Sequence, residues 1–231
     1  MTDICRQGDN TLDSRIVPII FVPGVMGSRL HFPAVDEYWD PDSWWSMSHW
    51  VAVSPEDERQ QIGFRARADI MTTGDNLTPS ELRRGFASVA AGFYVGFLRF
   101  LAGLTSLCAK TPVYAVGYDW RQSNKDSAGY LDTQITRILT QEKAENFVLI
   151  THSMGGIVAR ACLLANASGN SGKLLGVIHI VQPAAGAPGI LVLQQHANFA
   201  VFPGRELVSP RRKQDCRHIE RHTFCPAPHI T

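Results

Sequence analysis

The amino-acid sequence predicts an α/β fold in which helices flank an open, mostly parallel sheet. Four short apolar runs have the composition of buried strands, at residues 16–22, 112–117, 147–150 and 174–181. Between the later runs lie segments with apolar residues at helical spacing, such as the amphipathic pattern of residues 131–139. Because strands that alternate with helices form parallel sheets, and because 231 residues can bury one sizeable core, we expect a single core of this kind.

Composition and the absence of certain motifs indicate which partners, cofactors and compartment to expect. The 22 basic and 21 acidic residues nearly balance, so the net charge does not favour nucleic acid. Five widely spaced cysteines do not resemble a disulfide framework, and Cys162 is read as a small buried apolar residue. The first residues lack the pattern of a secretion signal, so we expect a cytoplasmic protein. No phosphate-binding glycine loop or nucleotide fingerprint is present, so no cofactor is expected.

The chain divides by pattern into three parts. We expect an N-terminal extension over residues 1–15, the core over residues 16–189 and an irregular tail over residues 190–231. Residues 36–80 are read as a tryptophan-rich cap or loop, because residues 36–50 hold Trp39, Trp44, Trp45 and Trp50 in an Asp/Pro/Ser-rich context unsuited to a regular strand or a long helix. These rings either line an acyl-chain site or lid, or anchor a long loop to the core.

Residues 86–109 are almost wholly apolar or small, which raises the question of a membrane span. Arg99 interrupts the run after residues 86–98, well short of the roughly 20 residues that a span needs. We therefore expect a buried helix or helix pair that packs against the sheet, and no transmembrane span.

The stretch FVLITHSMGG, residues 147–156, has the pattern of a nucleophile elbow. An apolar strand leads to Ser153, and Gly155 and Gly156 then open an apolar helical segment. The usual spelling of the motif is G-x-S-x-G, whereas the first position here is Thr151, whose side chain must be accommodated beneath the turn. The alternative is that Ser153 is only a helix N-cap. Strand, turn and helix occur together, which favours Ser153 as a catalytic nucleophile.

A second loop suits the same chemistry. The run of residues 16–22 ends in Pro23 and Gly24, and a glycine-containing loop after an early strand can aim backbone N–H groups at a developing oxyanion. By position we nominate the N–H groups of Val25 and Met154 as the two donors. The alternative for the loop is an ordinary Pro-Gly turn.

The acid and base that such a serine requires stay unassigned. The expected chain order is Ser, then Asp or Glu, then His. We expect His152 to point away from the site and His179 to be packed in a strand. The acidic and histidine residues that remain after Ser153 are Glu206, Asp215, Glu220, His196, His218, His222 and His229.

Two explanations compete for the tail that holds these residues, because it lacks strand or helix periodicity. Either the chain is truncated or frame-altered and lacks the base, or Asp215 or Glu220 completes an unusual triad with His222 or His229. The spacing of Cys216, His218, His222 and Cys225 matches no zinc pattern, so no metal site is expected.

Four motifs together carry a family resemblance. They are VPGVMGSRL at residues 22–30, GYDWR at 117–121, THSMGG at 151–156 and VQPAAGAP at 181–188. In order and rough spacing they resemble the lecithin:cholesterol acyltransferase and lysosomal phospholipase family of α/β hydrolases, over about residues 16–189. The resemblance implies an α/β hydrolase core, apparently incomplete at its C-terminus.

The resemblance also implies acyl chemistry on an ester. Ser153 would take the acyl group from a lipid or another apolar ester, and water or another alcohol would receive it. Asp119 and Arg121 would anchor a loop near the site, the alternative being a surface salt bridge. Peripheral contact with membranes is expected, and the oligomeric state is not predicted. The competing hypothesis is a catalytically inactive remnant that acts at most as a binding module.

Overall fold

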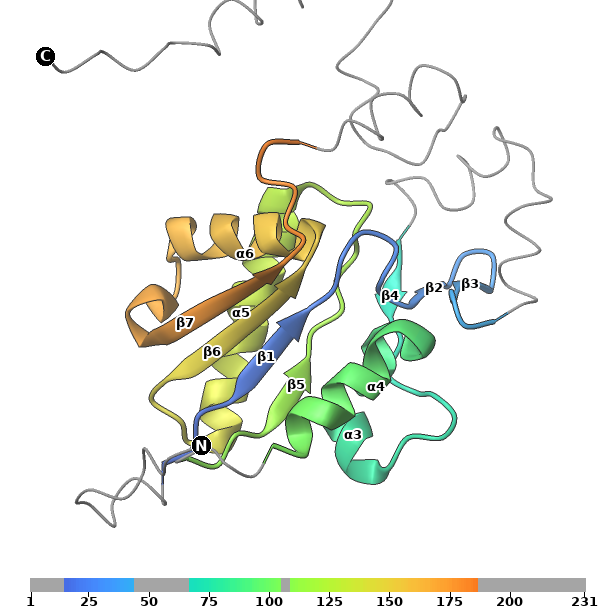
Figure 1. The fold of residues 1–231 in the computed structure, drawn as a ribbon. Coiled ribbons are helices and arrows are strands. Elements are labelled where there is room, and N and C mark those ends of the chain that lie inside the picture. The colour runs from blue at the N-terminus through green and yellow to red at the C-terminus, as the bar shows by residue number, and fades with distance from the viewer. Residues whose placement is uncertain (1–14, 44–66, 105–108, 187–231) are drawn as a thin grey trace, which may run out of the picture.

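The central feature of the fold is a four-stranded parallel sheet. The computed structural model describes residues 15–43, 67–104 and 109–186, so the expected tail, and the expected N-terminal extension apart from Arg15, lie outside these residues. The strands stand in the order β5-β1-β6-β7 (Figure 1). Their bounds are Ile19–Val22 for β1, Val113–Ala115 for β5, Phe147–His152 for β6 and Leu174–Ile180 for β7. The open parallel sheet predicted from the four apolar runs is confirmed.

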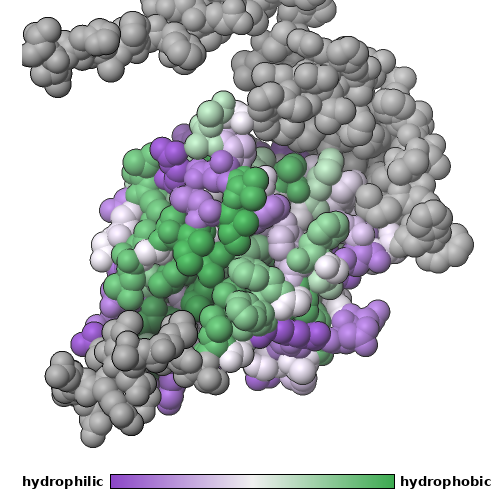
Figure 2. Space-filling view, viewed as in Figure 1, coloured by the Kyte–Doolittle hydropathy of each residue, from purple (hydrophilic) through white to green (hydrophobic). Residues whose placement is uncertain are grey.

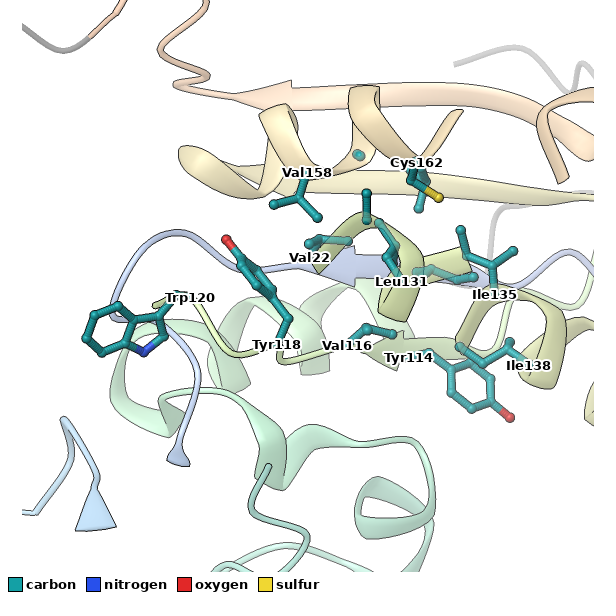
Figure 3. Close-up of a cluster of buried hydrophobic side chains, with 14 of the residues drawn as sticks. Val22, Tyr114, Val116, Tyr118, Trp120, Leu131, Ile135, Ile138, Val158 and Cys162 are labelled. Atoms are coloured by element: carbon teal, nitrogen blue, oxygen red, sulfur yellow. The ribbon is translucent and has the colours of Figure 1, made fainter. Parts of the chain in front are cut away.

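Helices α5 (Asn124–Glu142) and α6 (Met154–Ala165) cover one face of the sheet. Strand residues such as Val22 pack there against Leu131 and Ile135 of α5 and Val158 of α6, all fully buried (Figure 3). The apolar stripe of α5 is the amphipathic pattern seen in the sequence, and its other face is solvated. The turn that joins β6 to α6 is the predicted elbow.

Helix α4 (Ala91–Ala102) packs on the opposite face, where β5 and β1 lie. Its inner side chains Val95, Leu98 and Leu101 are buried against a cluster that includes Phe21 and Ile150. The expected buried helix pair is present as the short 3-10 helix η2 (Phe86–Ser88) followed by α4. None of the helices in the described ranges combines the length and the apolar character that a membrane crossing requires.

The β7 end of this second face is less well covered. Val148 of β6 is half-buried, and Ile178 of β7 is 55% exposed although the β-pairing puts it beside the buried Ile150. Figure 2 shows an apolar surface over this side of the sheet. Parallel sheets are normally covered on both faces, so the described elements cover this area of the sheet incompletely.

A small antiparallel sheet lies outside the main one. It comprises β2 (Leu30–Phe32), β3 (Glu37–Trp39) and β4 (Asp69–Ile70), in the order β3-β2-β4. The expectation that residues 36–50 contain no regular strand is therefore wrong for β3. Asp36 makes the hairpin possible, because it adopts the left-handed φ of 54° that short polar residues tolerate. Trp44, Trp45 and Trp50 lie outside the described residues.

A salt bridge explains the arginine in the apolar helix. The short helix α3 (Pro79–Arg83) begins with a capping box in which Thr78 and Glu81 exchange side-chain to backbone hydrogen bonds. The Arg99 guanidinium of α4 donates to the same Glu81 carboxylate at 2.6 Å. These contacts, first that of Arg99 and then that of the Thr78 N–H, lower the pKa of Glu81 from 4.5 to about 2.

We expect the Glu81→Gln variant to be less stable than the parent at neutral pH. The folded state lowers the pKa of Glu81, so its stabilisation is present above about pH 4.5 and is lost as the pH falls towards about 2. The difference in unfolding temperature between parent and variant should therefore shrink on acidification. Thermal unfolding followed by circular dichroism between pH 7 and pH 3 measures this, and a constant difference over that range would contradict it.

Candidate active site

Ser153 occupies the sharp turn between β6 and α6. Its backbone has φ 49° and ψ −124°, and its N–H donates to the carbonyl oxygen of Ile180 at 2.9 Å. A side chain at positive φ is strained, and such strain is typical of an elbow that lifts its serine clear of the sheet. The Ser153 side chain does not cap α6, and its hydroxyl has no hydrogen-bond partner among the described residues. The N-cap alternative therefore does not apply to this serine.

Close contacts between glycines and their neighbours bring the first loop against the elbow. A Cβ on Gly155 would lie 2.3 Å from the carbonyl oxygen of Pro23, so only glycine lets α6 approach the end of β1. A Cβ on Gly24 would lie 3.0 Å from the Cβ of Ser153. The Pro-Gly loop after β1 thus lies directly beside the serine, which makes it more than an ordinary turn.

Thr151 replaces the first glycine of the usual elbow motif, and the structure shows how its side chain is accommodated. Thr151 is fully buried, and its hydroxyl forms a 2.7 Å hydrogen bond with Nδ1 of His179 on the neighbouring strand β7. The two residues are paired in the sheet. The polar side chain beneath the turn therefore has a hydrogen-bond partner, so threonine is tolerated at this position.

The loop at residues 23–30 is held at several points. The Gly27 N–H donates to the Gly24 carbonyl at 3.1 Å, which closes a turn in which Met26 has φ 59°. The indole N–H of Trp39 donates to the Met26 carbonyl at 3.2 Å, and the Gly24 N–H donates to the hydroxyl of Tyr94 at 3.3 Å. Val25 lies inside this turn, so these contacts determine where its N–H can point.

Trp39 anchors a loop to the core. It is 5% exposed and packs edge to face against Trp120, with ring centroids 5.2 Å apart. Of the two alternatives for the tryptophan-rich segment, anchoring is therefore correct for Trp39.

The two nominated oxyanion donors belong to segments that adjoin Ser153. Val25 follows Gly24, and Met154 is the first residue of α6, where a helix leaves its N–H groups unbonded. Neither N–H donates to any residue in the described ranges, and both residues are half-buried. The N-terminus of α6 also favours negative charge. Their assignment as donors stays a prediction that this arrangement supports.

Asp119 and Arg121 form a buried pair rather than a surface salt bridge. Two N–H groups of Arg121 donate to the two carboxylate oxygens of Asp119 at 2.8 and 2.6 Å, and the Arg121 side chain is 1% exposed. The guanidinium also lies over the ring of Phe32, 4.8 Å from its centroid. The pair therefore joins the strand exit after β5 to the small sheet.

The acid and base are not assigned by the described residues. His179 is the one histidine after Ser153 among them, and its ring is bonded to Thr151. It lies in β7 as expected, but it is exposed rather than packed, because β7 has β6 as its only described neighbour. The other acidic and histidine candidates, and the cysteines considered for zinc, lie outside the described residues.

Sequence reasoning missed the role of Tyr94. Its hydroxyl lies 3.0 Å from Nδ1 of His152, the residue before the serine, and the two rings meet edge-on. Tyr94 is one aromatic residue among many on an apolar helix, so nothing local in the sequence distinguishes it. The burial of His152 lowers the pKa of its ring.

Comparisons with known proteins agree with this fold. The family model for lecithin:cholesterol acyltransferase matches residues 100–198, which include the elbow. A chain in the crystal structure of the Tle4-Tli4 complex is similar in fold, with a TM-score of 0.64 and 21% sequence identity over 82% of this chain and 50% of that chain. The present chain thus spans about half the length of that one. A comparison with curated proteins finds no match. These findings show that the chain has an α/β hydrolase-type fold and that residues 100–198 are similar to lecithin:cholesterol acyltransferase.

Proposed function

We propose that the chain acts as a serine-dependent acyl ester hydrolase or O-acyltransferase on a lipid or another apolar ester. The observation that carries the proposal is the position of the Ser153 hydroxyl. It is on a strained turn, makes no capping hydrogen bond to α6, and lies beside both the Gly24 loop and the N-terminus of α6. This juxtaposition supports acyl transfer, which needs an accessible alcohol beside backbone donors, and Ser153 is half-buried rather than enclosed.

The chemistry follows from these positions. The Ser153 oxygen attacks the ester carbonyl carbon as its proton passes to a base, and the tetrahedral oxyanion accepts hydrogen bonds from the N–H groups of Val25 and Met154. The base then gives this proton to the leaving oxygen as the bond to it breaks, so that an alcohol departs and an acyl-serine remains. Water or a second alcohol attacks that ester and releases Ser153. Each oxyanion donor typically contributes about 3 kcal/mol to such a transition state.

Exposed aromatic residues support an apolar substrate. Phe93 on α4 is 74% exposed and adjoins Tyr94, which contacts the Gly24 loop. Phe100, further along the same helix, is 62% exposed. Large exposed apolar side chains are suited to binding an acyl chain or a lipid surface. The same residues support the proposal of peripheral membrane contact.

A second function has one observation in its favour. Residues 154–186 contain no aspartate or glutamate, and their single histidine, His179, is bonded to Thr151. A chain that keeps the elbow without a working base would act at most as a binding module for the same apolar ligands.

A fluorophosphonate probe tests the proposal. If the chain is an active serine hydrolase, the probe forms a covalent bond to one residue, and peptide mass spectrometry finds it on Ser153. Absence of modification would favour the binding module. A variant that ends at Pro203 locates the base: an unchanged labelling rate shows that the base is not in the removed residues, and loss of labelling shows that it is.

A further inference from the structure

We infer that Tyr94 is a positioning residue that joins the oxyanion loop to the nucleophile elbow. The inference rests on the proposed function, and it concerns a residue that lies on α4, far from both motifs in the sequence. Tyr94 bonds to Gly24, next to the proposed donor Val25, and to His152, next to Ser153. One hydroxyl thus connects the two halves of the site.

These hydrogen bonds favour one protonation state of His152. The Gly24 N–H can only donate, so the Tyr94 oxygen accepts from it at 3.3 Å. The hydroxyl proton of Tyr94 stays available for Nδ1 of His152 at 3.0 Å, and in that arrangement the ring is neutral with its proton on Nε2. Burial lowers the pKa of His152 and favours the same neutral state.

Packing holds the Tyr94 ring in the position that these bonds need. The ring lies 5.0 Å from that of Phe21 on β1 and 5.7 Å from that of His152, measured between centroids. A Cβ on Gly27 would lie 2.7 Å from the Tyr94 oxygen, so glycine is needed there as well. Tyr94 therefore touches both ends of the turn that contains Val25, Gly24 through a hydrogen bond and Gly27 through close contact.

Tyr94 does not touch the reacting atoms, so its effect is indirect. Without the hydroxyl, the Gly24 N–H loses its acceptor and the Val25 N–H is held less firmly towards the oxyanion. Removing an oxyanion donor outright costs about 100- to 1,000-fold in rate, and a displaced donor costs less. We expect Tyr94→Phe to lower the rate constant of fluorophosphonate modification of Ser153 about 10-fold, with the probe affinity unchanged.

Tyr118→Phe is the matched control. Tyr118 is also a buried tyrosine near the sheet, but its hydroxyl has no hydrogen-bond partner among the described residues. Its loss should change the labelling rate less than about twofold. The extent of labelling at long times reports the folded fraction, so a misfolded variant lowers this extent whereas a positioning defect lowers only the rate.

Two further measurements separate positioning from structural support. His152→Asn retains an acceptor near the Nδ1 position and should keep most of the labelling rate. His152→Leu should lose part of the rate that Tyr94→Phe loses, because the Tyr94 hydroxyl still accepts from the Gly24 N–H, and the double variant should be little slower than Tyr94→Phe alone. Nitrogen-15 NMR of the wild-type ring should show the proton on Nε2.

The outcomes are distinct. If wild type is labelled and Tyr94→Phe reacts at the wild-type rate, the inference is wrong and the proposed function stands. Additive losses in Tyr94→Phe and His152→Leu, or a proton on Nδ1 of His152, would also overturn it. If wild type is not labelled at all, the proposed function fails and the role assigned to Tyr94 fails with it.

Discussion

Replacing Ser153 by alanine is expected to abolish modification by a fluorophosphonate, and replacing it by glycine should do the same while making the protein more stable. Alanine removes the attacking oxygen and keeps the strained backbone at φ 49°. Glycine populates positive φ without the steric cost of a Cβ, so Ser153→Gly should raise the free energy of unfolding by about 1 kcal/mol. Covalent labelling and urea unfolding measure the two effects.

The control for this experiment is the same substitution at a helical position. Ser127 lies within α5, where glycine is unfavourable, and its buried hydroxyl donates to the Asp119 carbonyl at 3.4 Å. Ser127→Gly should therefore lower the free energy of unfolding by about 1 to 2 kcal/mol. Opposite signs at the two sites would show that strain is stored at Ser153. A loss of stability in Ser153→Gly would show that it is not, and labelling of Ser153→Ala at the parent rate would place the reaction at another residue.

Replacing Asp119 by alanine is expected to lower the free energy of unfolding by about 3 to 5 kcal/mol. The substitution removes the carboxylate to which two N–H groups of the buried Arg121 donate, and a buried charge that loses its counter-ion is costly. Urea unfolding followed by tryptophan fluorescence measures the change.

A second ion pair in the same chain provides the comparison. Asp69 pairs with Arg67 at 3.2 Å, but both side chains are largely exposed. Asp69→Ala should therefore cost less than about 1 kcal/mol. Equal losses in the two variants would mean that burial does not distinguish the pairs, and would contradict the anchoring role of Asp119 and Arg121.

The sequence predicted the parallel core well because buried parallel strands are apolar along their whole length. All four runs contain strands, and the helical spacing after residue 130 belongs to α5. Strand limits were less accurate. The first run was expected to begin at Ile16, but β1 begins at Ile19, and Ile16 forms only an isolated bridge to Lys110. Pro18 lies between them and has no N–H for a ladder.

Contacts between distant residues could not be predicted from local patterns. Strands β3 and β4 have only three and two residues and gain their stability from pairing with β2, so neither has a periodicity of its own. The Tyr94 to His152 hydrogen bond joins residues 58 positions apart. The elbow could be predicted, because its strand, serine, glycines and helix are consecutive.

The Thr151 to His179 hydrogen bond has a consequence for how turns of this kind are found in sequences. A search pattern that demands glycine two positions before the serine would pass over this chain, although the turn itself is intact. Threonine is tolerated at this position because the adjacent strand β7 places a ring nitrogen of His179 within hydrogen-bond distance of the threonine hydroxyl. A better pattern would allow threonine wherever the following strand can supply such a partner.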